Sequence, residues 1–439
     1  EDIYLGGAAG QIKQLFVQKA GGKFVNSPQA DFSLDQTTEN TDATFFDADK
    51  DGDLDLFVVT GSNEFAENAP ELHDLLYLND GKGNLKRDVR FPMIYENGSS
   101  VSAADYDKDG DIDLFVGTRM INAKYGQSAQ SNLFINDGTG GFKNQSKRYM
   151  PQVTELGMVT DSEWSDVNGD GYVDLLVTQD WGPVVVFKNE RGRKLTKQEP
   201  VAGSEGLWSC IKPADIDGDG DMDFVLGNFG LNSKIKASAE SPAYLHVGDF
   251  DKNGAIEQII SCVTEDGNMY PMVLKGEMQR ALPMIKKKFI KYKDYANKTV
   301  DELFSEEQRE GAIVRQITTT ESSFLINDGK GNFSLQALPY QAQFSPIRGI
   351  QAADFNKDGK LDILLAGNFF DSLPEWGRFD ANYGLLLEGQ GKGKFAVKLS
   401  KQTGFKTLGQ VRNMALVKGG KSTYVVLAKN DDKAQVFKF

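Results

Sequence analysis

Short apolar segments recur along the chain, each beginning directly after an acidic residue. Three of them cover residues 56–59, 114–116 and 175–177 and consist of Leu, Val and Phe. Runs this short and this rich in branched and aromatic residues are typical of buried strands. The hydrophobic pattern therefore predicts an all-β protein.

A second pattern follows most of these segments: two apolar runs separated by a tight turn, often with the sequence Asn-Asp-Gly-x-Gly. Asn and Gly tolerate the positive φ angles that tight hairpins require. We expect hairpins at 76–85, 133–142 and 324–333, and looser ones at 185–195, 385–395 and, without the Asn-Asp, at 15–24. Each repeat would then contain four strands, and repeated units of about 50 residues indicate a β-propeller of four-stranded blades.

The acidic residues before the apolar segments belong to six copies of one nine-residue loop. Asp stands at the first position, Asp or Asn at the third and fifth, Gly at the sixth, and Asp or Glu at the ninth. The copies start at Asp47, Asp105, Asp166, Asp215, Asp249 and Asp354. Because one copy could be chance and six cannot, the loop is a part of the architecture.

The first copy shows the chemistry of the loop. Asp47, Asp49, Asp51 and Asp55 place four carboxylates around the turn at Gly52, and the carbonyl of Asp53 faces the same point. Such an oxygen cage suits a hard divalent cation, above all Ca²⁺. An EF-hand would need Glu at the twelfth position. The six copies instead have an aliphatic residue there: Val58, Val116, Val177, Leu226, Ile260 and Leu365.

Charge and composition narrow the class of protein. The net charge is −14, and six calcium ions would nearly cancel it. Basic stripes with interleaved aromatic residues are absent from the sequence, so we expect no nucleic-acid partner. No apolar run reaches the roughly 20 residues that span a bilayer. Loops of this kind fill at extracellular or periplasmic calcium, so we expect an exported, extracellular, cell-surface or periplasmic protein.

The two cysteines and the chain start leave two questions open. Cys210 and Cys262 lie in neighbouring repeats and could pair or remain thiols. Glu1 begins without a basic and apolar leader, so we expect a fragment of a larger exported protein.

The spacing of the loops sets the number of blades. The last two spacings between loop starts are 34 and 105 residues, and most of the excess lies at 276–311. That segment has helical spacing and a capping box at 299–302, which predicts a helical insertion within one blade. Residues 2–5 match the ninth to twelfth positions of a metal loop, as in the interior of another repeat. Segment 411–439 resembles three strands whose loop, around Gly419 and Gly420, has lost its carboxylates. We predict one domain over 1–439 with seven blades, eight being the alternative.

The repeated loop and hairpin, always in this order, resemble the FG-GAP or VCBS repeat of the integrin α-subunit propeller and of bacterial exported proteins. Segments 157–166, 285–296 and 345–350 further resemble bacterial relatives of cartilage acidic protein, which carry ASPIC or UnbV segments. The resemblance implies about six structural Ca²⁺ sites. Beyond the first copy, the resemblance implies that the residues at the same five loop positions, the first, third, fifth, seventh and ninth, are also ligands. They are Asp105, Asp107, Asp109, Asp111, Asp113, Asp166, Asn168, Asp170, Tyr172, Asp174, Asp215, Asp217, Asp219, Asp221, Asp223, Asp249, Asp251, Asn253, Ala255, Glu257, Asp354, Asn356, Asp358, Lys360 and Asp362. Copies three, five and six have fewer carboxylates and should bind more weakly.

Topology separates the metal loops from the variable loops. A loop between strands one and two and a turn between strands three and four lie at the same end of a blade. The segments 62–74, 119–131, 180–183, 228–242 and 369–382 would collect on the other face, where variable loops carry function. The candidate ligand residues there are Trp376, Arg378, Asp380, Trp181 and Tyr125, with Trp208 beside them; the alternative is that the aromatic residues fill blade junctions.

Three functions remain possible on the sequence. The favoured one is non-catalytic binding or adhesion to an extracellular protein or glycan. With only His73 and His246, a histidine-based active site is improbable. A calcium-dependent polysaccharide lyase using a Lys or Tyr base is the enzyme to exclude. A passive spacer domain of a larger surface protein is the third possibility.

Overall fold

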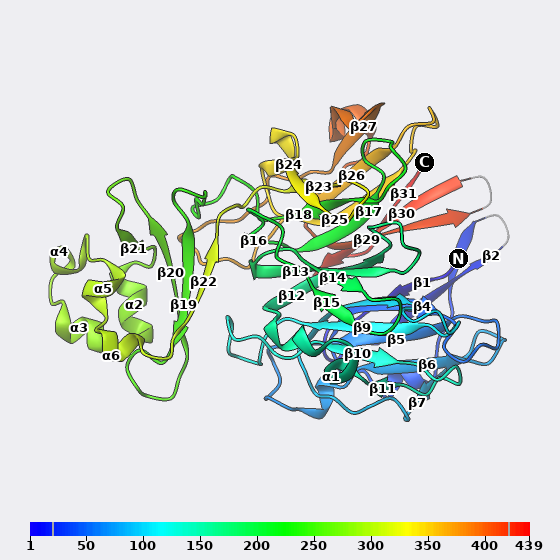
Figure 1. Cartoon of the computed structure of the whole chain (residues 1–439), viewed down its shortest axis with the longest axis horizontal. Coiled ribbons are helices and arrows are strands. Elements are labelled where there is room, and N and C mark those ends of the chain that lie inside the picture. The colour runs from blue at the N-terminus through cyan, green and yellow to red at the C-terminus, as the bar shows by residue number, and fades with distance from the viewer. Residues whose placement is uncertain (20–21, 420–421) are drawn as a thin grey trace.

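The computed structural model describes residues 1–19, 22–419 and 422–439, and it consists mainly of antiparallel sheets (Figure 1). The predicted all-β class and the four-stranded units are confirmed. Ala20 and Gly21, in the predicted hairpin 15–24, lie outside the described residues, as does Gly420 in the loop that lacks carboxylates. We number the sheets 1 to 7 in chain order and treat an eighth, the inserted sheet, separately.

Sheets 2, 3, 4 and 6 are simple meanders in which neighbouring strands follow one another in sequence. Sheet 2 contains β4 (Asn40–Phe46), β5 (Asp55–Thr60), β6 (Leu75–Asn79) and β7 (Leu85–Asp88). Sheet 3 contains β8 (Gly98–Ala104), β9 (Asp113–Thr118), β10 (Asn132–Ile135) and β11 (Lys143–Asn144). Sheet 4 contains β12 (Met158–Ser165), β13 (Asp174–Gly182), β14 (Val185–Asn189) and β15 (Leu195–Lys197), and β16 (Gly206–Leu207) also pairs with β13. Sheet 6 contains β25 (Ile347–Ala353), β26 (Asp362–Gly367), β27 (Leu385–Gly391) and β28 (Lys394–Leu399).

The two ends of the chain form three-stranded sheets. Sheet 1 contains β1 (Ile3–Leu5), β2 (Gln14–Lys19) and β3 (Lys23–Asn26). Sheet 7 contains β29 (Gln410–Gly419), β30 (Ser422–Asn430) and β31 (Gln435–Lys438). Their side chains pack together, since Ile3 of sheet 1 shares a cluster with Val417 and Val426 of sheet 7.

Successive sheets pack face to face through alternating side chains of the second strand. In β5, Leu56 and Val58 pack with sheet 1, whereas Phe57 and Val59 pack with sheet 3. The same alternation continues through sheets 4, 5, 6 and 7. Because both faces of each sheet are buried, the second strands are apolar at almost every position rather than at every second one. This packing is the reason for the continuous apolar segments in the sequence.

The fourth repeat departs from the predicted meander. Sheet 5 contains β17 (Cys210–Ala214), β18 (Asp223–Gly227), β23 (Ser323–Asn327) and β24 (Phe333–Ala337). The chain therefore leaves this sheet after its second strand and returns to it for the third. The hairpin at 324–333 therefore completes the sheet of the fourth loop, not that of the fifth. The reason is that β18 pairs with β23 across a long insertion, with Phe224 opposite Leu325.

The insertion contains a sheet of its own, and the fifth acidic loop belongs to that sheet. Its strands are β19 (Ala243–Gly248), β20 (Glu257–Val263), β21 (Met269–Pro271) and β22 (Ile313–Ile317), in the order β21-β20-β19-β22. Figure 1 shows this sheet and its helices projecting to one side of the other sheets. The 34-residue spacing is short because the fifth loop is not part of the series of stacked sheets.

The longest group of helices lies between β21 and β22. It consists of α2 (Lys275–Ala281), α3 (Met284–Lys288), α4 (Tyr292–Tyr295), α5 (Val300–Leu303) and α6 (Glu306–Arg309). The capping box of α5 is formed: Glu302 N–H donates to Thr299 Oγ1 at 3.3 Å, and Thr299 N–H donates to Glu302 Oε2 at 2.9 Å. Two further short helices are α1 (Ser146–Tyr149) and α7 (Ser400–Thr403).

Candidate metal loops and the opposite face

Each acidic loop turns at the glycine of its sixth position. The six glycines have φ angles from +83° to +98°, where an L side chain would be strained. In five loops the N–H of this glycine donates to the first-position carboxylate, as Gly171 does to Asp166 Oδ2 at 2.7 Å. The first carboxylate is thereby held inside the turn.

Four of the six loops bring three carboxylates close enough to share one cation. In each group, one oxygen atom from every side chain lies within 4.8 Å of the others. The groups are Asp47, Asp49 and Asp55; Asp105, Asp107 and Asp109; Asp215, Asp217 and Asp223; Asp249, Asp251 and Glu257. The loops at 166–174 and 354–362, both described in full, form no such trio because Asn168 and Asn356 stand at the third position.

Several carboxylate oxygens of these loops are buried without a hydrogen-bond donor among the described residues. They are the Oδ1 atoms of Asp47, Asp49, Asp53, Asp105, Asp107, Asp221 and Asp251. A buried charged oxygen without a partner is costly, and a bound cation would satisfy it. The atoms that could coordinate a metal in these loops are carboxylate and carbonyl oxygens. The loops therefore fit Ca²⁺ better than a transition metal.

The ninth-position carboxylate is buried and joins the metal loop to the hairpin turn of the same sheet. Asp113 accepts the N–H of Asn136 at 2.9 Å through Oδ1 and the N–H of Tyr106 at 3.4 Å through Oδ2. Asp55, Asp174, Asp223 and Asp362 make the same pair of bonds. Burial raises the pKa of Asp113 to about 7, although the two N–H donors oppose this rise. The ninth residue thus has a structural role whether or not it also binds a cation.

In three sheets, the asparagine of the hairpin turn connects the sheet to the one before it. The Asn136 side-chain amide donates to the carbonyl of Ala48 at 2.8 Å, in the loop of the preceding sheet. Asn189 and Asn327 donate in the same way to Tyr106 and Val167, at 2.8 and 2.9 Å. Metal loops and hairpin turns therefore share one face, as the topology predicted.

Neighbouring metal loops also contact each other through their fourth and seventh positions. Lys50 of the first loop forms an ion pair with Asp111 of the second. Lys108 of the second loop lies 4.5 Å from the ring centroid of Tyr172 in the third. The side chains of Asp111 and Tyr172 thus contact the adjacent loop, which leaves their carbonyl groups as the available metal ligands.

A separate group of charged residues lies on the first strands of sheets 2, 4 and 5. Asp42 Oδ2 accepts the N–H of Val101 at 3.0 Å, and Asp161 Oδ2 accepts the N–H of Ile211 at 2.9 Å. Glu163 and Lys212 complete the group. Burial lowers the pKa of Lys212, but the charges of Asp161, Glu163 and Asp42 outweigh it and raise that pKa. Burial, followed by repulsion from Asp161, raises the pKa of Asp42 to about 7; burial raises that of Glu163 to about 7 as well.

This group predicts a pH-dependent effect of the substitution Glu163→Gln. Because folding raises the pKa of Glu163 above its ordinary value of 4.5, the folded state retains a proton that the unfolded state releases between those two pH values. Stability is therefore lost as the pH rises toward 7. At saturating calcium, the variant should melt about 2 °C higher than the parent at pH 8 and equally at pH 4.5. An exposed control, Glu199→Gln, should change neither melting temperature, and a variant that melts lower at pH 8 would contradict the expectation.

On the face opposite the metal loops, the aromatic candidates are packed rather than free. Trp181, Tyr125 and Trp376 lie in one apolar cluster with Leu245 and Ile317 of the inserted sheet. The Tyr125 hydroxyl donates to Asp180 Oδ2 at 2.8 Å. Trp208 is 1% exposed in the core between sheets 4 and 5, and its indole N–H donates to the Ser204 carbonyl at 2.6 Å. The insertion packs against Trp181, Tyr125 and Trp376, a contact that spacing along the chain cannot reveal.

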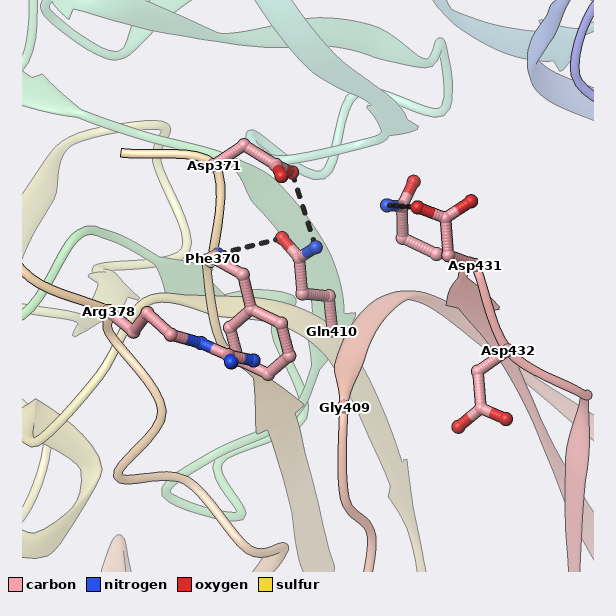
Figure 2. A pocket seen from close by; sticks show the side chains of 8 residues that line it. Phe370, Asp371, Arg378, Gly409, Gln410, Asp431 and Asp432 are labelled. Carbon is pink, nitrogen blue, oxygen red and sulfur yellow. Dashed lines mark hydrogen bonds between the residues drawn. The ribbon is translucent and has the colours of Figure 1, made fainter. Parts of the chain in front are cut away.

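Arg378 and Asp380, by contrast, are exposed. Arg378 lines a shallow pocket of about 400 Å³ formed by the loop between β26 and β27, the start of β29, and the turn between β30 and β31. The other lining residues are Phe370, Asp371, Gly409, Gln410, Asn430, Asp431 and Asp432. Figure 2 shows Arg378 alongside the ring of Phe370, with its guanidinium carbon 3.9 Å from the ring centroid. Asp380 is not among the lining residues.

The two cysteines are both free thiols, which settles the open alternative. Cys210 is buried in β17 of sheet 5, and Cys262 lies in β20 of the inserted sheet. Burial raises the pKa of the Cys210 thiol to about 12, so this thiol is unreactive.

Comparison with known proteins supports the repeat family. The family model for the FG-GAP-like repeat matches residues 166–226, which span the third and fourth acidic loops. A T-cell immunomodulatory protein homolog from Plasmodium yoelii yoelii is 22% identical over 236 residues, 46% of this chain. The match spans 32% of the length of that relative. FG-GAP repeats occur in extracellular and surface proteins.

Two solved structures resemble the chain at low scores. The biofilm matrix protein Bap1 of V. cholerae has a TM-score of 0.39 and 12% identity, covering 100% of this chain and 87% of that one. BBS1N, solved in complex with ARL6DN, has a TM-score of 0.35 and 8% identity, covering 91% of each chain. Among the described residues, no helix has the length and apolar character needed to cross a bilayer.

Proposed function

We propose that this chain is a calcium-stabilised, non-catalytic propeller that binds a protein or a glycan outside the cell. Its seven stacked sheets would be the blades of one closed ring within a single domain. Two observations support closure: sheet 1 shares apolar clusters with both sheet 2 and sheet 7, and Gln18 Nε2 donates to the Lys418 carbonyl at 2.9 Å. The helices at 276–311 belong to an insertion within the fifth blade.

Calcium would be a structural component of the ring. The four carboxylate trios and their buried oxygens without donors carry this part of the proposal. Three of the trios lie in the second, third and fifth sheets, and the remaining one lies in the inserted sheet. The cation would neutralise the repulsion between carboxylates and fix the turn between strands one and two. The two loops with Asn at the third position would bind it more weakly.

The ligand would bind on the face opposite the metal loops. That face carries the long loops between second and third strands and the pocket lined by Arg378. Asp380 lies beside this pocket in the same loop, whereas Trp181, Tyr125 and Trp376 would support the face from beneath. Variable loops can change there without loss of the blades, which suits recognition of a partner.

A binding screen with face-specific variants tests the proposal. The calcium-loaded protein would be screened against a glycan array and purified extracellular matrix proteins. Arg378→Ala should weaken the observed binding about tenfold or more, whereas Lys82→Ala, in an exposed turn beside the metal loops, should not. Equal melting temperatures would confirm that both variants are folded. Binding that both variants retain would overturn the proposed face, and binding to nothing would favour a spacer domain.

An absorbance assay distinguishes the enzyme alternative from a binding protein. A lyase acting on uronates would raise the absorbance of the reaction mixture over time as unsaturated products form, and a binding protein would leave it constant.

We further propose that the chain is a piece of a longer exported protein and that its relatives include bacterial cartilage acidic protein homologues. Residues 157–166, 285–296 and 345–350 support this second relationship.

A further inference from the structure

The helices between β21 and β22 have a small hydrophobic core of their own. Met278, Leu282, Ile285, Phe289 and Leu303 are buried in one cluster. Ile285 and Phe289 stand four residues apart at α3, and the three residues between them are exposed. One side of α3 therefore packs inward and the other faces solvent.

Three apolar side chains of this helical group lie in solvent instead of in the core. Ile290 is 80% exposed, more than any other large hydrophobic side chain that the structure describes. Tyr292, at the start of α4, is 67% exposed, and Leu274, just before α2, is 62% exposed. The packing of the helices does not account for these three residues.

Contacts between α4 and the start of α2 bring the exposed apolar residues to one region. The Tyr295 hydroxyl donates to the carbonyl of Val273 at 2.8 Å. Lys275 Nζ lies 4.8 Å from the ring centroid of Tyr292. Leu274 stands between the two residues that α4 contacts, so it lies next to Tyr292.

The chain around these apolar residues is strongly basic. Residues 284–298 contain six lysines and a single acid, Asp294, although the whole chain has a net charge of −14. Lys288 Nζ donates to the carbonyls of Glu302 and Leu303, and Lys298 forms an ion pair with Glu302. The other four lysines are exposed and form no ion pair with any residue that the structure describes: Lys286, Lys287, Lys291 and Lys293.

The acidic residues of the insertion are separated from these lysines. Residues 301–310 contain five acids and one arginine. Glu307 of α6 pairs with Lys252 of the fifth metal loop at 2.7 Å, so α6 lies beside that loop. Figure 1 shows α3 and α4 at the end of the insertion farthest from the other sheets. We call Leu274 and residues 284–298 the basic end of the insertion.

We propose that the basic end of the insertion binds to a membrane surface that contains anionic lipids. This contact is additional to the proposed ligand face and does not depend on it. Each free lysine would raise the affinity for an anionic surface about fivefold. Leu274, Ile290 and Tyr292 would enter the boundary between lipid headgroups and acyl chains. A soluble acidic polymer would bind the lysines but leave these apolar side chains in water, so a lipid surface fits better.

Vesicle flotation with the calcium-loaded full chain tests the inference. The probes are vesicles of phosphatidylcholine alone, vesicles of phosphatidylcholine mixed with phosphatidylglycerol, and soluble dextran sulfate. The chain should float with the mixed vesicles and not with the neutral ones, and binding should weaken as the salt concentration rises. Arg378→Ala, on the ligand face, should bind vesicles as the parent does.

Two charge variants locate the contact. Replacing Lys286, Lys287, Lys291 and Lys293 together by Gln should weaken binding to the mixed vesicles about a hundredfold or more. The matched control replaces four exposed lysines in hairpin turns on the metal-loop face and should change the affinity less than about twofold. Both variants lose the same charge and should keep the melting temperature of the parent. The lysines of the control are Lys82, Lys330, Lys392 and Lys394.

The apolar residues have a separate test. Ile290→Ser should weaken vesicle binding about tenfold, whereas Val89→Ser, at an equally exposed site on sheet 2's side of the chain, should not. In Tyr292→Trp, brominated lipids should quench the added tryptophan emission. Absence of vesicle binding, or equal loss in the two charge variants, would overturn the inference. Lysine-dependent binding to dextran sulfate, with no effect of Ile290→Ser, would replace the membrane with an acidic polysaccharide.

Discussion

Chelation with excess EDTA is expected to lower the melting temperature of this protein by about 10 °C. Each ion that binds only the folded loop stabilises the folded state by about 1.4 kcal/mol for every tenfold excess of calcium over its Kd, and the contributions of separate sites add. Differential scanning calorimetry in calcium and in EDTA measures the difference. Readdition of calcium should restore the original melting temperature, and magnesium at the same concentration should restore less of it.

The number of bound ions provides a second, independent measurement. The structure groups carboxylates in four loops, so equilibrium dialysis at low calcium should give about four ions per chain rather than six. The combined variant Asp105→Asn and Asp107→Asn should reduce this number by one, because it removes two of the three carboxylates of the second loop. A melting temperature that EDTA leaves unchanged would contradict structural calcium altogether.

The second large effect is expected for Asp113→Ala, which should destabilise the fold by about 3 kcal/mol both with and without calcium. Asp113 is 1% exposed and accepts two backbone N–H groups, those of Asn136 and Tyr106. Removing the carboxylate would leave both donors buried without an acceptor, at about 1–3 kcal/mol each. Urea unfolding in calcium and in EDTA measures the loss.

Asp109→Ala is the matched control in the same loop. Asp109 is exposed and belongs to the carboxylate trio of the second loop, whereas Asp113 does not. The control should therefore be destabilised in calcium and nearly equal to the parent in EDTA. If the cost of Asp113→Ala also disappears in EDTA, its role is that of a metal ligand and not a connection between loop and hairpin.

The sequence predicts those parts of the fold that depend on neighbouring residues. The strands β5, β9, β13, β18, β20 and β26 begin at the ninth residue of a metal loop, and the Asn-Asp-Gly turns form hairpins where expected. Both signals are local: a loop needs Gly at its sixth position, and a strand buried on both faces needs an apolar run. The membership of β23 in sheet 5 is not local, because its partner β18 lies about a hundred residues earlier, and nothing in the spacing identifies it.

The candidate ligand face was predicted only in part for the same reason. Arg378 lies in the pocket, but Trp181 and Trp376 are covered by an insertion whose contacts are invisible along the chain.

The insertion in sheet 5 also determines the order in which the chain can fold during synthesis. When β18 leaves the ribosome, its outer neighbour β23 has not yet been made, so one edge of β18 stays open until the inserted sheet and its helices have followed. An open apolar edge is a site for mispairing, and closing a long loop has an entropic cost. Early folding of the insertion would shorten the effective distance between β18 and β23, since its first and last strands, β19 and β22, are hydrogen-bonded neighbours. An insertion that folds first would therefore hold the two halves of the fifth sheet close together.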